Sequence, residues 1–284
     1  MKITFDNVVA TVEFADQKEK ESFDKLKKSL TVMAPGAEYT KLYRQWKISK
    51  GKSGWSGQGN LINDAFATGL LPTIRDMLWH QFKILPTLVD TRPKYNINAF
   101  ISTIPLKDYQ EVAFQACIGN SFNHMSWPRG IIHLATGGGK PHIAMALYQY
   151  YNEPTLFLVH RKDLVTQTAE RFKQFLGITP TIIMEGAIIP GDKTIAIATI
   201  QTLTSLTKQG VLKLDHIKQV IFDEAHLAAA SLAKGNHIVK TAAMLENAHI
   251  RWGLTATPFM RDKYSNWLLK GISGEIVYTK SSLD

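Results

Sequence analysis

The sequence predicts an α/β fold in two parts: a small N-terminal α+β domain, followed by a parallel sheet covered by helices. In the second part, short apolar runs alternate with helical stretches, and this alternation is typical of parallel sheets. Several runs are almost continuously hydrophobic, as expected for strands that are buried on both faces. We therefore expect domains at residues 1–95 and 96–270, with residues 271–284 as the beginning of a linker.

The expected N-terminal domain contains a strand pair and two helices. Apolar and polar residues alternate within the first 14 residues, which predicts the two strands. Apolar residues at helical spacing predict a helix over 17–30. A second helix is expected over 71–84, with a proline near its first turn. Residues 91–94 then have the composition of a linker.

Between these helices, residues 39–63 are basic and aromatic and contain no acidic side chain. Basic side chains neutralise phosphates, and exposed aromatic rings stack on unpaired bases with about 1–3 kcal/mol each. A solvated basic loop whose tryptophans pack in the core would have the same composition. The nucleic-acid-binding candidates of this segment are Arg44, Trp46, Lys47, Lys50 and Lys52.

Six apolar runs predict the strands of the second part. They are Ile131–Ala135, Thr155–His160, Thr181–Met184, Thr194–Ile200, Gln219–Asp223 and Arg251–Thr257. Right-handed crossovers place the carboxyl ends of parallel strands at one edge of the sheet, where ligands bind. The two motifs described next each follow the end of such a run, so we expect them to meet at that edge.

A glycine-rich loop, residues 134–140, joins the first run to a helix expected from Pro141 to about Tyr151. Its glycines let backbone N–H groups point at a phosphate, and Lys140 reaches the outer phosphates. The alternative is a glycine-rich turn that binds nothing. The residue after the lysine is normally Ser or Thr, whose hydroxyl holds Mg²⁺, but here it is Pro141. We therefore expect weaker Mg²⁺-dependent hydrolysis than in a Pro141→Thr variant.

A pair of acids ends the run at 219–223, in the sequence Asp223-Glu224-Ala225-His226. One carboxylate at this edge can bind Mg²⁺, and the next can deprotonate the attacking water. His226 is placed to sense the outermost phosphate. The alternative is a helix N-terminus that merely carries acids, but it leaves unexplained why the acids follow a strand downstream of a phosphate loop.

The composition is that of a globular protein with a basic surface. A formal charge of +9 favours polyanionic partners. The single cysteine, Cys117, lies in a helical apolar pattern, which predicts packing, and its isolation fits a reducing compartment. No apolar stretch reaches the roughly 18 residues of a membrane span, and the N-terminus lacks the apolar core of a signal peptide. We expect a monomeric protein of the cytoplasm, or of the host cytoplasm if a phage encodes it.

Taken together, the motifs resemble those of superfamily 2 helicases and translocases of the DEAH-box type. The glycine loop, the Asp-Glu-Ala-His sequence and residues 253–258 resemble motifs I, II and III. Residues 108–110, 157–164 and 198–203 resemble the glutamine motif and motifs Ia and Ib. The resemblance covers the first RecA-like lobe and implies ATP and Mg²⁺ as cofactors and nucleic acid as the partner.

The resemblance also implies roles for individual residues. Gln110 would read the adenine edge with Tyr109 beside it, and Asp223 would hold Mg²⁺ while Glu224 activates water. Thr255 and Thr257 would couple hydrolysis to movement. The phosphates would be bound by Thr136, Gly137, Gly138, Gly139 and Lys140. The nucleic-acid backbone would be contacted by His160, Arg161, Thr199, Gln201 and Thr202, and such contacts read no sequence.

The N-terminal part is similar to the accessory domain of phage helicases that remodel branched DNA. The similarity rests on residues 43–47 and 69–72, followed by an apolar helix. Enzymes of this kind need a second RecA-like lobe, and the residues after Pro258 are too few to form one, so we expect a fragment of a longer protein. The favoured function is an ATP-dependent helicase acting on branched or forked DNA. The alternatives are the motor subunit of a restriction system and a nucleic-acid-binding module with a degenerate ATP site.

Overall fold

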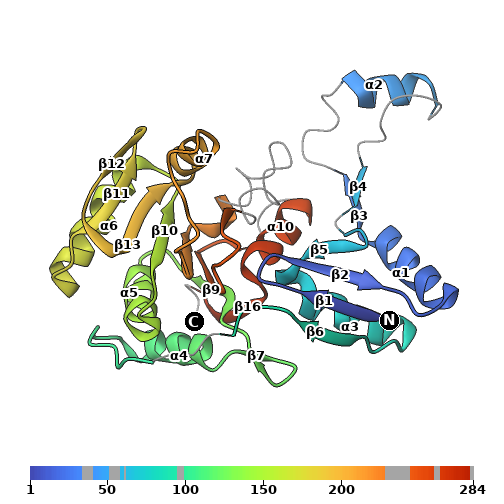
Figure 1. Ribbon diagram of the computed structural model, residues 1–284, viewed down its shortest axis with the longest axis horizontal. Helices are drawn as coiled ribbons and strands as arrows, with labels where there is room; N and C mark the ends of the chain where they lie inside the picture. The colour runs from blue at the N-terminus through green and yellow to red at the C-terminus, as the bar shows by residue number, and fades with distance from the viewer. Residues whose placement is uncertain are drawn as a thin grey trace.

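The computed structural model describes residues 1–33, 41–50, 58–60, 62–94, 99–227, 244–258 and 263–281. Its N-terminal part folds around a four-stranded sheet (Figure 1). In spatial order the strands are β5 (Ala65–Ala67), β2 (Val9–Glu13), β1 (Lys2–Phe5) and β6 (Thr87–Asp90). The predicted strand pair is confirmed, because β1 and β2 are antiparallel neighbours. Ile3 and Phe5 on β1 are fully buried beneath the helices.

Two helices, α1 (Gln17–Ser29) and α3 (Leu71–Phe82), pack against this sheet and confirm the helical spacing seen in the sequence. Helix α1 begins after Asp16, whose side chain accepts the amide of Glu19 at 2.8 Å. Helix α3 carries Pro72 in its first turn, where no intrahelical donor is lost. Both helices turn apolar side chains such as Phe23 and Leu78 towards the sheet.

Helix α2 (Lys41–Ile48) lies apart from both sheets, beyond a ribbon of two short strands, β3 (Thr31–Met33) and β4 (Gln58–Asn60) (Figure 1). It falls within the basic segment 39–63. The described side chains of α2 are exposed, and Ile48 is 84% exposed. This helix therefore contributes a projecting surface rather than a part of the core.

The second part is an eight-stranded sheet in which neighbouring strands are parallel, apart from one antiparallel edge strand, β12. In spatial order the strands are β12 (Ala187–Ile189), β11 (Pro180–Met184), β13 (Asp192–Thr199), β10 (Thr155–Val159), β14 (Gln219–Asp223), β15 (Ile250–Thr255), β9 (Arg129–Leu134) and β16 (Ile276–Lys280). All six predicted runs are strands of this sheet. The predicted α/β class and RecA-like lobe are thus confirmed.

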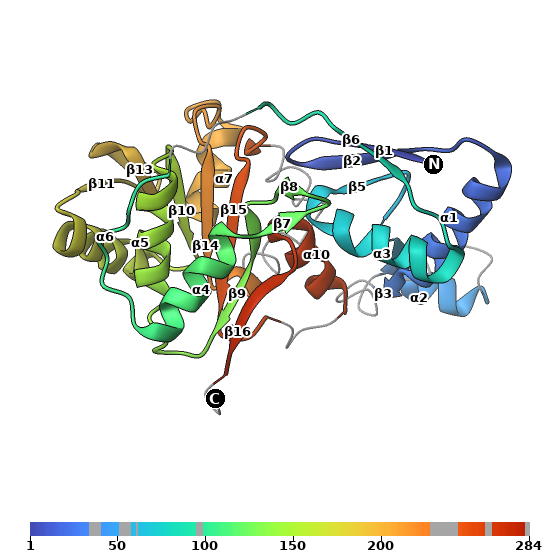
Figure 2. The same cartoon turned by 90° about the horizontal axis from the view of Figure 1, so that it is seen from below.

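Helices cover both faces of the large sheet. On one face lie α4 (Asp108–Ile118), α5 (Lys140–Tyr151) and α6 (Lys162–Leu176), and on the other lie α7 (Ile200–Lys208) and α10 (Lys263–Ser273) (Figure 2). Strand side chains alternate between the two cores: Ile132 faces α5, whereas Ile131 faces α10. Cys117 is fully buried in the first core, and burial raises the pKa of its thiol. Its expected packing role is therefore confirmed.

Within the expected linker 271–284, the described residues up to 281 differ from the expected form. Residues Ile276–Lys280 do not run free as a linker but form β16, the edge strand that pairs in parallel with β9. An edge strand needs only one apolar face, so its short sequence carries a weak signal. The division of the chain into domains at 95 and 270 stays a prediction.

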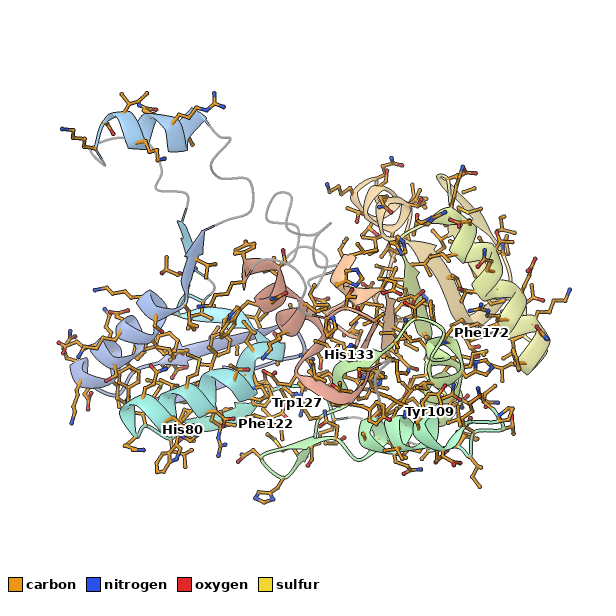
Figure 3. The ribbon with its side chains drawn as sticks, turned by 180° about the vertical axis from the view of Figure 1, so that it is seen from behind. His80, Tyr109, Phe122, Trp127, His133 and Phe172 are labelled. Atoms are coloured by element: carbon orange, nitrogen blue, oxygen red, sulfur yellow. The ribbon has the colours of Figure 1, made fainter. Side chains whose placement is uncertain are left out.

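The two parts share an extensive contact. Helix α10 approaches the short helix η2 (Thr68–Leu70) so closely that a Cβ at Gly69 would collide with the carbonyl of Lys270. The carboxylate of Glu275 accepts a hydrogen bond from Thr73 and pairs with Lys270 at 2.6 Å. On the opposite side, Phe122 and Trp127 from the hairpin of β7 (Ser121–Phe122) and β8 (Met125–Ser126) pack into the N-terminal core (Figure 3). Each part thus contributes side chains to the other.

Candidate functional site

The glycine loop joins the end of β9 to the start of α5, as the sequence predicted. Gly137 and Gly139 have φ of +79° and +74°, values that favour glycine. A Cβ at Gly139 would also collide with the Gln110 side chain. The loop therefore needs glycine for two physical reasons, its backbone conformation and the close approach of α4.

Lys140, the first residue of α5, is buried to 7% exposure and points back across the strand ends. Its Nζ lies 3.3 Å from Oε1 of Glu224 and 3.5 Å from the carbonyl of Leu134. Since Glu224 follows β14 and Leu134 ends β9, the lysine bridges two strands that are separated by β15. Lys140 and the acid pair therefore converge at one edge of one sheet.

The two acids differ in their surroundings. Burial raises the pKa of Asp223, the charge of Glu224 raises it further, and Lys140 opposes this shift. Glu224 itself has φ of +45°, an uncommon conformation for a residue with a side chain. The backbone turn at Glu224 directs its carboxylate to both Lys140 and His226. Asp223 is left as a half-buried carboxylate whose charge is only partly compensated.

His226 connects the acids to the end of β15. Its Nδ1 lies 2.8 Å from Oγ1 of Thr255 and 3.5 Å from Oε2 of Glu224. The hydroxyl of Thr257 lies 3.5 Å from the same ring, and the amide of Thr257 donates to Oγ1 of Thr255 at 3.1 Å. The residues matched to motifs II and III are thus in direct contact, which allows a change at Glu224 to reach Thr255.

The predicted adenine-reading residues lie against the glycine loop. Gln110 is buried; its Oε1 accepts the amide of Lys107 at 2.9 Å and its Nε2 donates to the carbonyl of Gly138 at 3.1 Å. The hydroxyl of Tyr109 donates to the same carbonyl at 3.2 Å (Figure 3). The side-chain amide of Gln110 is therefore engaged at both ends, so its role in reading adenine stays a prediction.

The nucleic-acid candidates of the second part follow β10 and β13, at the same edge as the acids. Arg161 is exposed and forms a two-point pair with Asp163 at 3.0 and 2.9 Å. Thr199 caps α7 by accepting the amide of Thr202, and Gln201 is exposed beside them. Nδ1 of His160 is buried without a hydrogen-bond partner in the described part of the chain. Contact of these residues with nucleic acid stays a prediction.

On helix α2, the side chains of Arg44 and Lys47 are exposed, and Lys50 is exposed just beyond the helix. Trp46 lies on the same helix, but its side chain is outside the described residues, and so is Lys52 as a whole. A basic surface is present here, and its ligand stays a prediction.

His133 is a polar residue that the sequence analysis treated only as part of a strand. Its Nε2 lies 3.0 Å from the carbonyl of Ala256, between the two threonines that contact His226. An imidazole within the apolar run 131–134 was the available signal.

In the part of the chain that the structure describes, no group of three His, Cys, Asp or Glu side chains could hold a metal ion. Among the same residues, no helix is long and apolar enough to cross a membrane.

Known proteins share both the sequence and the fold. Residues 103–260 match the family described as "Type III restriction enzyme, res subunit" (ResIII). A DNA 3'-5' translocase, XPB2 of Sulfurisphaera tokodaii, is 30% identical over 240 residues, which are 79% of this chain and 50% of that protein. A putative ATP-dependent DNA helicase, fml2 of Schizosaccharomyces pombe, is 32% identical over 146 residues, 45% of this chain and 18% of that protein. The chain thus spans half or less of the length of these relatives.

The crystal structure of the UvsW helicase from bacteriophage T4 has a TM-score of 0.70 to this chain and 20% sequence identity. The match covers 98% of this chain and 100% of that one, including the N-terminal part. At this identity the likeness establishes the fold alone. With the ResIII match over more than half of its length and a translocase as a relative, the chain belongs to the ResIII helicase family of superfamily 2 and contains a RecA-like lobe.

Proposed function

We propose that this chain carries the first RecA-like lobe and a DNA-binding accessory domain of an ATP-dependent helicase or translocase that remodels branched or forked DNA. The supporting observation is that Lys140, Asp223 and Glu224 converge at one strand edge, where Glu224 contacts His226 and His226 contacts Thr255. The relative from Sulfurisphaera tokodaii is described as a DNA translocase, which supports DNA as the partner.

The glycine loop and Lys140 would hold the phosphates of ATP. Backbone N–H groups at the start of α5 and the positive end of the helix both favour an anion there. Lys140 Nζ, paired with Glu224 in this structure, would exchange that partner for a phosphate oxygen. Glu224 would then be released to accept a proton from the attacking water, a role worth about 10²–10⁴-fold in rate.

The residues present fit Mg²⁺ in part. Asp223 supplies a carboxylate at a strand end, where burial and then the charge of Glu224 raise its pKa, so a bound cation would favour the charged carboxylate. Pro141 supplies no hydroxyl at the position where this loop usually has one. Asp223 would therefore hold the ion, whose contribution is to neutralise charge on the phosphate oxygens. Water or phosphate oxygens would fill the remaining positions.

Movement along DNA would arise from the contact between the acids and motif III. A change at Glu224 would be felt by His226 at 3.5 Å and, through it, by Thr255 at 2.8 Å. We further propose that a second RecA-like lobe of the whole protein completes the nucleotide site. The basic surface of α2 would bind the phosphate backbone, since its described cations are exposed.

Two alternatives give different results. The family description favours a motor subunit of a restriction system, and the longer protein would then also cleave DNA. A DNA-binding module with a degenerate ATP site is favoured by Pro141. Hydrolysis that is stimulated by forked DNA and lost in Glu224→Gln would support the proposal. The same nucleotide binding without any turnover would support the degenerate module.

The DNA-binding surface has its own test in the salt dependence of fork binding. Replacing Arg44, Lys47, Lys50 and Lys52 by alanine should lower the slope of log K against log salt by up to about 3.6, since each lost phosphate contact contributes about 0.9. A matched control replaces four exposed lysines of α1 by alanine, namely Lys18, Lys20, Lys25 and Lys28. An equal change in both variants would assign the effect to net charge and count against α2.

A further inference from the structure

His133 lies near the end of β9, one residue before Leu134, and on the same face of the sheet as Ile131 (Figure 3). Ile131 is fully buried, whereas the imidazole of His133 is partly exposed. Its Nε2 lies 3.0 Å from the carbonyl oxygen of Ala256. Because a carbonyl only accepts, the imidazole must donate from Nε2.

The acceptor of this bond, the carbonyl of Ala256, lies just beyond the end of strand β15. Strand β15 ends at Thr255, which is in register with His133, so Ala256 is the first residue beyond the strand ladder. The residues on either side of it, Thr255 and Thr257, both present their hydroxyls to His226. The bond from His133 thus ties the middle of this turn to the strand that leads into the glycine loop.

These contacts close a ring around the strand ends. The carbonyl of Leu134, the residue after His133, accepts a hydrogen bond from Lys140. Lys140 pairs with Glu224, and Glu224 contacts His226. His226 contacts both threonines, which flank the carbonyl that His133 holds. Every member of the ring except His133 belongs to one of the motifs described above.

We propose that His133 is a positioning residue for hydrolysis: its N–H fixes the turn at 255–257 and thereby keeps both threonine hydroxyls within reach of His226. This inference rests on the proposed function for its catalytic consequence, but the positioning itself does not. Without the donor, the carbonyl of Ala256 would turn towards water, and the turn would lose its attachment to β9. The substrate-binding residues Lys140 and Asp223 would keep their places.

The test compares His133→Gln with His133→Leu. The side chains have similar size, and the amide of glutamine reaches about as far as Nε2, whereas leucine cannot donate. Amide hydrogen exchange of residues 254–257 should be about fivefold faster in the leucine variant, the change expected for one lost hydrogen bond, and near wild type in the glutamine variant. In the same proteins, kcat for DNA-stimulated ATP hydrolysis should fall about tenfold in the leucine variant, with KM nearly unchanged.

Exchange rates that are equal in all three proteins, or raised equally in both variants, would overturn the proposal. So would faster exchange in the leucine variant with an unchanged kcat. If the leucine variant does not fold, His133→Asn replaces it, because the asparagine amide is too short to reach Ala256. A wild-type protein that hydrolyses no ATP would count against the proposed function, and the exchange rates would still decide whether His133 positions the turn.

Discussion

The large sheet holds charged groups both at the edge where its parallel strands end (the carboxyl edge) and at the opposite edge where they begin, but these groups are satisfied in different ways. At the carboxyl edge, Lys140 and Glu224 contact each other through their side chains. At the opposite edge, Arg251 is buried at the start of β15 and donates to the carbonyls of Ala248 and Leu245 at 2.8 and 2.6 Å. Arg129, at the start of β9, is also buried and donates to the carbonyl of Asn7 at 2.8 Å.

Under the proposed function, this difference separates a site that exchanges partners when a ligand binds from one that does not. A backbone carbonyl is held by the chain on both sides, so an arginine bonded to it is fixed in place. An ion pair between two side chains can open when a ligand offers a better partner. Burial lowers the pKa of Arg251 to about 10 and raises that of Asp223. The free-energy cost of burying the Arg251 charge is offset by hydrogen bonds to carbonyls within the fold. The cost of the Asp223 charge is offset only in part by Lys140, and under the proposed function a bound cation would offset the rest.

The largest expected effect is on the rate of ATP hydrolysis and comes from a substitution at the carboxyl edge. Glu224→Gln should lower the rate of ATP hydrolysis by about 10²–10⁴-fold, because the amide cannot accept the proton of water. Stability and nucleotide affinity should change little, since the glutamine has the same shape and still contacts Lys140. Steady-state ATP hydrolysis with forked DNA measures the rate, and nucleotide titration measures the affinity. The matched control is Glu185→Gln, an exposed acid that pairs with Lys162; a rate within tenfold of wild type in Glu224→Gln would contradict the assignment.

The next largest effect comes from a substitution at the opposite edge, which should change the free energy of unfolding alone. Arg251→Met keeps an unbranched apolar side chain but removes the donors to the carbonyls of Ala248 and Leu245. The free energy of unfolding should fall by about 2–3 kcal/mol, as expected for the loss of charged hydrogen bonds. Urea unfolding measures the loss, and hydrolysis per folded molecule should be preserved. If Arg251→Met is as stable as the wild type but hydrolyses ATP more slowly, the purely structural role given to Arg251 is wrong.

A pH dependence sharpens the same comparison. His249 is 5% exposed beside the opposite edge, and burial lowers its pKa from 6.5 to about 4. Between these values the unfolded chain binds a proton that the folded protein does not, so stability falls as the pH is lowered. At pH 5 the loss due to this residue should be about 2 kcal/mol relative to pH 7.

His249→Gln should remove this part of the pH dependence, whereas His80→Gln, at an exposed histidine, should retain it. Urea unfolding of the three proteins at pH 7 and pH 5 provides the measurement. The same loss of stability between pH 7 and pH 5 in His249→Gln and in the wild type would place the acid sensitivity elsewhere in the chain.

The contrast between the edges also explains which features could be predicted from the sequence. Buried parallel strands leave continuous apolar runs, and the glycine loop and acid pair have fixed spacings, so the six strands and the meeting of Lys140 with Glu224 were predicted. Arg129 and Arg251 gave no signal, because their partners are carbonyls of residues that could be of any type. The contact of His133 was missed for the same reason, since its acceptor is a backbone atom of Ala256.

The smallest effect concerns Pro141, the residue that departs from the usual phosphate loop. It stands in the first turn of α5, where its fixed φ suits the helix but its ring offers no oxygen. In Pro141→Thr the hydroxyl would add a ligand for Mg²⁺, and hydrolysis should rise by about tenfold, the effect of roughly 1.4 kcal/mol of barrier. Stability should fall by about 0.4–1 kcal/mol, because the unfolded chain gains freedom without proline.

These opposite changes can be separated with Pro141→Val. Valine has nearly the shape of threonine and also releases the backbone, but it has no hydroxyl to offer. The threonine and valine variants should therefore lose similar stability in urea, and only the threonine variant should hydrolyse ATP faster when Mg²⁺ is titrated. If both variants hydrolyse at the same rate, the carboxyl edge completes its metal site without this position, and Pro141 is a helix-starting residue that costs the enzyme nothing.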